Sequence, residues 1–92
     1  ASSSQRRFLV IGRISEWKGQ QFVIDALRTV EQPIELMILG DSAPGREAYE
    51  QHLRDSAQLL QRHTVRFVGF VNNPDAFYRA ADFVLVPSLL PE

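Results

Sequence analysis

Phe8-Leu9-Val10-Ile11 and Leu36-Met37-Ile38-Leu39 are two short apolar runs, and each is followed directly by a glycine. Phe83-Val84-Leu85-Val86 is a third continuous run, while a fourth, Val65 to Val71, includes a charged residue and a glycine. Continuous apolar runs, rather than alternating ones, are typical of strands buried on both faces of a parallel sheet. The runs therefore predict four strands, with the one at Val65 to Val71 nearer an edge.

Helical patterns lie between the predicted strands. Lys18 to Val30 carries an apolar stripe at helical spacing, and Ser15 can cap its start. Arg46 to Arg62 repeats this pattern. Asn73-Pro74-Asp75 combines a capping residue, a first-turn proline and a first-turn acid, which predicts a short helix over residues 74–81.

The alternation of strands and helices predicts an α/β, Rossmann-like fold with parallel strands and right-handed crossovers. The usual strand order is 3-2-1-4, with the switch point between the first and fourth strands. Helices 18–30 and 46–62 should then cover one face of the sheet and helix 74–81 the other. Ligands of such sheets bind beyond the carboxyl ends of the strands at the switch point, which selects the loops Gly12 to Lys18 and Pro87 to Glu92.

The first of these loops carries two cations. Gly12 to Gly19 reads Gly-Arg-Ile-Ser-Glu-Trp-Lys-Gly. Arg13 offers a forked donor, Lys18 a point charge, and the predicted helix its N-terminal amides, which together suit a diphosphate. Alternatively, Arg13 and Lys18 are solvated loop charges. Trp17 could be a stacking platform or a half-buried loop residue.

Three other strand ends supply candidate site residues. Gly40-Asp41 and Gly69-Phe70-Val71 end the second and third strands, where a glycine lets a ligand or another backbone approach closely, or simply makes a turn. Ser88 and Glu92 follow the fourth strand. The Glu92 carboxylate could bind sugar or ribose hydroxyls, or it could be an ordinary surface glutamate.

Composition excludes several classes of protein and site. The chain has 92 residues, which allows one small domain, and its net charge of -1 provides no basic field for nucleic acid. It has no cysteine, and its two histidines, predicted to be exposed, are too few for a zinc site, so no metal site is expected. No apolar run approaches the ~18 residues of a membrane span. The glycine fingerprints of dinucleotide-binding and phosphate-loop proteins are absent.

Taken together, five stretches resemble the C-terminal domain of family 4 retaining glycosyltransferases, the group 1 family with the GT-B fold. They occur in family order and spacing, and they are Val10-Ile11-Gly12-Arg13 through Trp17-Lys18-Gly19, Leu36 to Asp41, Val65 to Val71, Phe77 to Asp82, and Val86 to Glu92. The resemblance covers about residues 7–92. It implies that these residues are part of a donor-binding domain, and we expect residues 1–6 to be a linker or an expression remnant.

The resemblance also implies roles for particular residues. Arg13 and Lys18 would hold the donor diphosphate and neutralise the leaving group without a metal cofactor, Glu92 would contact the donor sugar, and the loop at Gly69 to Val71 would meet the base. The implied donor site comprises Gly12, Arg13, Lys18, Gly40, Asp41, Gly69, Phe70, Val71, Ser88 and Glu92.

The implied activity is transfer of a hexose, with retention, from a UDP- or GDP-linked sugar. The acceptor domain would precede this chain in the same protein, so we expect the chain alone to be inactive. The whole enzyme would be cytoplasmic and able to associate with the inner face of the membrane. We also expect the chain to self-associate, because the short helix 74–81 would leave apolar surface on its face of the sheet and strand 83–86 would leave an apolar edge. Edge pairing, face-to-face packing, or both would result. The alternative is a non-catalytic Rossmann-like module that binds a ligand or a partner, because a fold does not fix a function.

Overall fold

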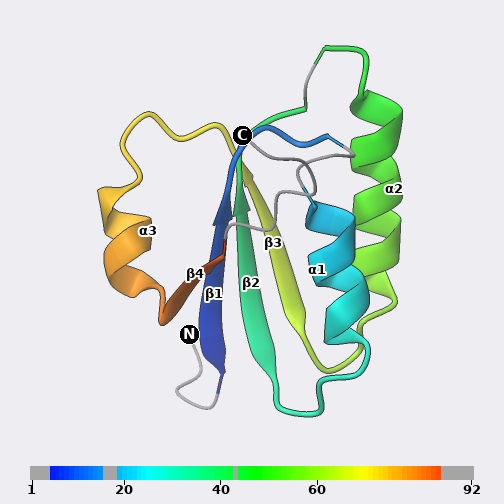
Figure 1. The fold of residues 1–92 in the computed structure, drawn as a ribbon, viewed down its shortest axis with the longest axis vertical. Helices are drawn as coiled ribbons and strands as arrows, with labels where there is room; N and C mark the ends of the chain where they lie inside the picture. The colour runs from blue at the N-terminus through cyan, green and yellow to red at the C-terminus, as the bar shows by residue number, and fades with distance from the viewer. Residues whose placement is uncertain (1–4, 16–18, 43, 86–92) are drawn as a thin grey trace.

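The computed structural model describes residues 5–15, 19–42 and 44–85. In these residues strands and helices alternate along the chain (Figure 1), as β1 (Arg6–Ile11), α1 (Gln20–Leu27), β2 (Ile34–Leu39), α2 (Glu47–Gln58), β3 (Thr64–Gly69), α3 (Asp75–Ala80) and β4 (Phe83–Leu85). The strands form one parallel sheet in the order β3-β2-β1-β4. The predicted fold class and strand order are therefore confirmed.

β2 lies between β1 and β3, and all six of its residues are buried. Its side chains alternate between two cores: Leu36 and Ile38 join the core beneath α1 and α2, while Met37 and Leu39 join a smaller core with Leu9. A strand with apolar packing on both faces needs apolar residues at every position, which accounts for the continuous run.

The helices divide between the two faces of the sheet as right-handed crossovers require. α1 and α2 lie on one face and α3 on the other (Figure 1). Val23, Ile24 and Leu53 bury the first pair of helices in the larger core, and Phe77 packs α3 on the smaller one. The predicted faces are confirmed.

All three helices are shorter than the sequence pattern predicted. α1 follows Gly19, whose φ of +84° does not fit a right-handed helix, and residues 28–30 form a tighter turn with i→i+3 hydrogen bonds. Leu59 and Leu60 end α2 in the same way. The predicted cap at Ser15 is wrong, because its side chain is buried and makes no capping bond. The Asn73 Oδ1 does accept a hydrogen bond from the Asp75 amide at 3.1 Å, at the start of α3.

His63 lies in the turn before β3, but the prediction that it is exposed is wrong, because it is partly buried. Its Nδ1 accepts a hydrogen bond from the Ile34 amide at 3.1 Å, and its Nε2 lies 2.9 Å from the Val30 carbonyl oxygen. Both ring nitrogens therefore satisfy backbone groups at the entrance to β2, so the imidazole joins the turn before β2 to the turn before β3.

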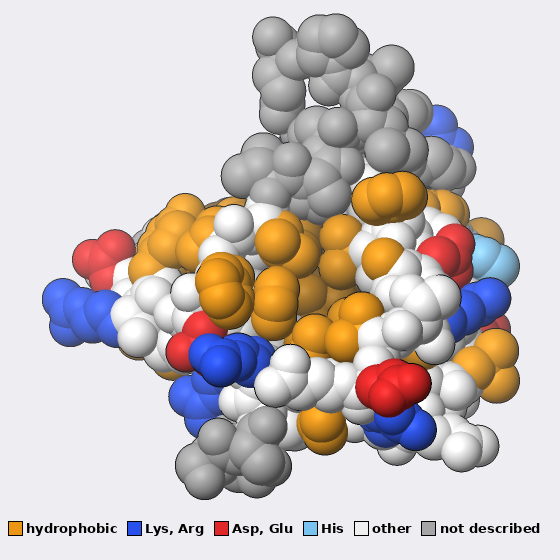
Figure 2. All heavy atoms as spheres, turned by 60° about the horizontal axis from the view of Figure 1, so that its bottom comes forward, with side chains coloured by type: hydrophobic (Ala, Val, Ile, Leu, Met, Phe, Trp, Pro, Cys, Tyr) orange, Lys and Arg blue, Asp and Glu red, His pale blue; other side chains and the backbone are white. Residues whose placement is uncertain are grey.

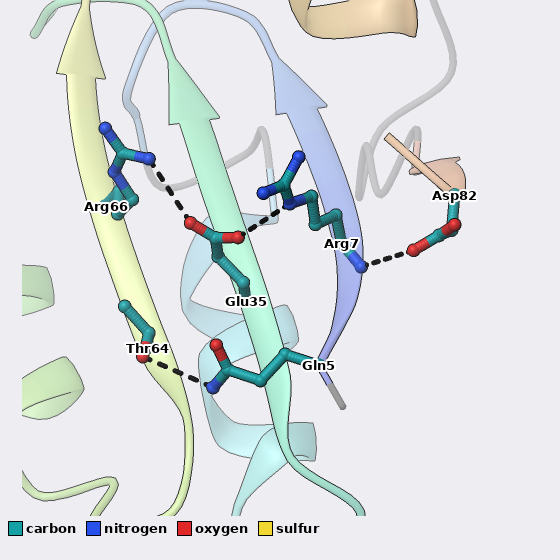
Figure 3. Close-up of polar contacts among 6 residues, drawn as sticks. All are labelled: Gln5, Arg7, Glu35, Thr64, Arg66 and Asp82. Carbon is teal, nitrogen blue, oxygen red and sulfur yellow. Dashed lines mark hydrogen bonds and ion pairs between the residues drawn. The ribbon is translucent and has the colours of Figure 1, made fainter. Parts of the chain in front are cut away.

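A buried carboxylate interrupts the apolar pattern of β2. Glu35 is only 5% exposed, and it accepts from Arg7 Nε at 3.0 Å and from Arg66 Nη1 at 3.3 Å, so three neighbouring strands are joined side by side (Figure 3). Asp82 accepts from the Arg7 amide at 2.8 Å on the other side of β1. Arg66, predicted only as a sign of an edge strand, therefore also holds the amino-terminal half of the sheet together.

Replacing Glu35 by alanine should lower the free energy of unfolding by about 2 kcal/mol. The loss stays below that of a fully buried pair because the freed Arg7 and Arg66 side chains, which are 32% and 59% exposed, can reach water. Asp25→Ala is the matched control, since it removes an exposed pair with Arg28 at 3.5 Å and should change stability by less than about 0.5 kcal/mol. Chemical denaturation followed by circular dichroism tests this, and equal losses for the two variants would contradict it.

An apolar groove of about 380 Å³ lies beside α1, on the face opposite α3, between Phe22 of that helix and Phe8 and Leu85 of the sheet. Figure 2 shows hydrophobic side chains gathered in a hollow on one side of the molecule. Uncovered apolar surface was predicted on the α3 face. In the described residues both faces of β4 are partly exposed, through Phe83 at 50% and Val84 at 46%. Self-association through this strand stays a prediction.

Candidate functional site

The carboxyl ends of β1, β2 and β3 surround a pocket of about 240 Å³. Its lining residues come from the three strand ends and the loops that follow them: Ile11, Gly12, Arg13, Leu39, Gly40, Asp41, Phe70, Val71 and Pro74. Six of these were predicted as site residues from the sequence, and the structure brings them together. Ile11, Leu39 and Pro74 were missed, because apolar strand residues and a helix-start proline give no chemical signal of a site.

The loops after β1 and β2 run side by side beyond the ends of their strands. The Gly12 amide donates to the Leu39 carbonyl and the Ile14 amide to the Asp41 carbonyl, both at 2.9 Å. A parallel bridge between Ile14 and Ser42 continues the pairing. The backbone beneath the pocket is therefore an extension of the sheet.

One of the predicted glycines, Gly40, is required by the close packing of backbone against backbone. A Cβ atom at Gly40 would lie 2.0 Å from the Gly12 carbonyl oxygen, so no larger residue fits there. Gly69 does not line the pocket; its carbonyl accepts from the Gly40 amide at 2.7 Å. At Gly12 and at Gly69, in contrast, a Cβ atom would meet nothing within 4 Å. Of the alternatives for Gly40 and Gly69, the close approach of another backbone explains Gly40, whereas Gly69, with a φ of +89° and open space at its Cβ position, fits a turn glycine. Gly12 leaves open space at the site.

Arg13 supplies the positive charge of this pocket and Asp41 its carboxylate. The Arg13 guanidinium has no hydrogen-bond or ion-pair partner among the residues that the structure describes. The Arg13 backbone carbonyl accepts a hydrogen bond from Gln20 Nε2 at 3.2 Å. The arrangement thus fixes the backbone of Arg13 and leaves its side chain available to an anion.

The sequence model of the family described as "Glycosyl transferases group 1" matches residues 5–92. The chain belongs to this family. No curated protein matches the chain.

Two solved structures share the fold of this group 1 chain. HepE from Anabaena, crystallised with UDP and glucose, has a TM-score of 0.81 and 26% sequence identity. The C-terminal domain of LpcC, a group 1 glycosyl transferase from Francisella tularensis, has a TM-score of 0.71 and 23% identity. They are matched over 98% and 90% of this chain, but it spans only 25% and 46% of theirs.

Several predicted residues of this glycosyltransferase chain lie outside the described residues. They are Trp17, Lys18, Ser88 and Glu92. Of the three residues to which the resemblance assigned a part in the chemistry, only Arg13 is described, so the roles of the other two stay predictions. Within the described ranges, no three His, Asp or Glu side chains are grouped so that they could hold a metal ion, and no helix is long and apolar enough to cross a membrane.

Hydrogen bonds join Ser42, in the loop after β2, to residues of α2. The Ser42 hydroxyl donates to Glu50 Oε1, and Glu50 Oε2 accepts from Arg54 Nε at 3.0 Å and Nη2 at 2.8 Å. The Arg54 guanidinium lies 4.6 Å from the centroid of the Phe67 ring. Arg54 is exposed on the surface of α2, and its contacts also link the loop after β2 to β3. The i,i+4 spacing of Glu50 and Arg54 was the available signal.

The hydrogen bond from Ser42, together with the hydrogen bond and charge of Arg54, lowers the pKa of Glu50 from 4.5 in spite of partial burial. A lowered pKa in the folded state means that ionised Glu50 stabilises the fold above pH 4.5, and that this contribution is lost as the pH falls through the folded-state value. Glu50→Gln should therefore cost about 1 kcal/mol at pH 7 and progressively less below pH 4.5.

Urea unfolding at several pH values tests this expectation. Glu47→Gln is the control, because Glu47 shares the first turn of α2 with Glu50 but lacks the Ser42 bond. Ser42→Ala should follow the pH profile of Glu50→Gln. A cost of Glu50→Gln that stays constant down to pH 3 would mean that the loss is one of packing and not of charge.

Proposed function

We propose that this chain is part of the donor-binding domain of a glycosyltransferase that moves a sugar from a UDP- or GDP-linked donor to an acceptor. The observation that carries the proposal is the pocket at the carboxyl edge, which is lined by Arg13, a residue whose cationic side chain has no partner among the described residues. Membership of the group 1 family and the likeness to HepE, which was solved with UDP and glucose, support it.

The chemistry of the proposal concerns the leaving group. When the bond between the sugar C1 and the diphosphate oxygen breaks, negative charge builds on the diphosphate. Arg13 and Lys18 neutralise that charge with side-chain cations, so the proposed reaction uses no metal cofactor. Glu92 contacts the sugar, which is a hexose transferred with retention. Acceptor binding belongs to another part of the protein, so the 92-residue chain alone should give no turnover.

The other end of the pocket suits the base. Phe70 is 72% exposed and lines the pocket with Val71 and Pro74. Exposed aromatic and apolar side chains at a strand end provide a surface on which a planar base can stack. The donor therefore lies along the carboxyl edge, with the base beside Phe70 and the diphosphate beside Arg13.

Titrating the ¹⁵N-labelled chain with UDP-glucose and, separately, GDP-mannose tests the proposal by NMR. The amides of Gly12, Arg13 and Asp41 should shift with one of the two donors, and Arg13→Ala should weaken the response. Inorganic phosphate is the control for a non-specific anion. Shifts confined to the amino-terminal edge of the sheet, or none with either donor at millimolar concentration, would oppose the proposal and favour a non-catalytic module.

A further inference from the structure

The buried side-chain polar atoms without a hydrogen-bond partner in the described residues all belong to one stretch of the chain. They are the Ser15 Oγ, the Gln20 Oε1 and the Gln21 Oε1. Such atoms lower stability, and native structures hold few of them. Gln20 is the extreme case, because it is 1% exposed and lies in the first turn of α1. An apolar side chain of the same length would pack there without an unpaired oxygen, so packing alone does not explain this glutamine.

Gln20 makes one contact that an apolar residue could not make. Its Nε2 donates to the carbonyl oxygen of Arg13 at 3.2 Å. The residues on either side of Arg13 are held by β2 and its loop, through the Gly12 and Ile14 amides. The backbone is thus held at three consecutive residues, and the amide of Gln20 supplies the attachment at Arg13 itself. A backbone held in this way presents its side chain with little reorganisation, which is what charge stabilisation in a transition state requires.

We infer that Gln20 is a positioning residue for the donor diphosphate: its carboxamide fixes the Arg13 backbone so that the guanidinium meets the diphosphate without rearrangement. This inference rests on the proposed function. Gln20 itself does not line the pocket. It acts through Arg13, and the contact with the Arg13 carbonyl is the reason that a polar residue occupies a buried position.

Gln20→Met in the full-length enzyme tests the inference, because it keeps the length of the side chain but removes both the donor and the unpaired oxygen. The melting temperature should equal or exceed that of the wild type, while kcat/KM for the donor should fall about 10- to 100-fold. Gln21→Met is the matched control. It also removes an unpaired oxygen, but Gln21 bonds Asp25 at 2.8 Å and not the loop, so its kcat/KM should stay within about twofold of wild type.

A double variant separates positioning from a general structural role. In the Arg13→Ala background, Gln20→Met should cause no further loss, because the guanidinium that it positions is gone. Additive losses, or a lowered melting temperature that accompanies the loss of rate, would overturn the inference. Should Gln20→Met fail to fold, Gln20→Leu also removes the donor and the unpaired oxygen with a shorter apolar side chain, and should show the same loss of kcat/KM.

The same assays distinguish failure of the inference from failure of the proposed function. If the wild type transfers sugar and Arg13→Ala slows it, but Gln20→Met does not, the inference alone is wrong. If the wild-type enzyme transfers no sugar from a UDP- or GDP-linked donor, the proposed function fails and the inference fails with it.

Discussion

Gly40→Ala should lower the free energy of unfolding by about 3–5 kcal/mol and leave much of the chain unfolded at 25 °C. An added Cβ atom would lie 2.0 Å from the Gly12 carbonyl oxygen and 2.7 Å from its carbon. Both are backbone atoms, held by the bond from the Gly12 amide to the Leu39 carbonyl, so they cannot move aside without opening the sheet between β1 and β2. The φ of Gly40, +129°, adds conformational strain.

Gly12→Ala separates the clash from the strain. Gly12 also has a positive φ, +148°, but nothing lies within 4 Å of the position that its Cβ atom would occupy. Its cost should be about 1 kcal/mol, from backbone conformation alone. Thermal and chemical unfolding of the two variants, followed by circular dichroism, give the comparison. Equal losses would show that the backbone at Gly40 yields easily and that the close approach of the two loops matters little.

The sheet could be predicted because its signal is local. The continuous apolar runs of β1 and β2 indicate strands that are covered on both faces, and the alternation with helices then leaves few topologies. Handedness fixed the face of each helix, and the topology rule for ligand sites selected the carboxyl edge. The predicted residues between Gly12 and Val71 that line the pocket all lie at or just after the carboxyl ends of strands. Their position in the site could therefore be predicted without knowledge of their side-chain contacts.

Features that depend on distant partners could not be predicted. In the sequence, Glu35 is a charged residue in an otherwise apolar strand with no visible partner. Its partners Arg7 and Arg66 lie 28 and 31 residues away. His63 looks like a turn residue until β2 is placed beside it. Gly40 and Gly12 each follow an apolar strand directly, so the sequence does not distinguish them. Only the structure shows that a Cβ atom at Gly40 would meet backbone, whereas one at Gly12 would meet open space. Gln20 resembles any polar residue at a helix start.

In the full-length enzyme, Arg13→Ala should lower kcat about 10²- to 10³-fold, with a smaller effect on the KM for the donor. The leaving diphosphate carries more negative charge in the transition state than in the bound donor, so a fixed guanidinium stabilises the transition state more. Arg13→Lys should recover part of the loss, because lysine restores the charge but not the forked geometry. Lys18→Ala should cause a loss of the same order if Lys18 has the role that the family resemblance implies.

Arg28→Ala is the matched control for these rates, because Arg28 follows α1 at the opposite end of the helix and pairs only with Asp25, at 3.5 Å, among the described residues. It should leave kcat within about twofold of wild type. Steady-state kinetics with a saturating acceptor would give the comparison. If Arg13→Ala and Lys18→Ala were both as active as Arg28→Ala, the two cations would be ordinary solvated charges. The free guanidinium at the pocket would then say nothing about the reaction, and charge stabilisation would have to come from groups outside this chain.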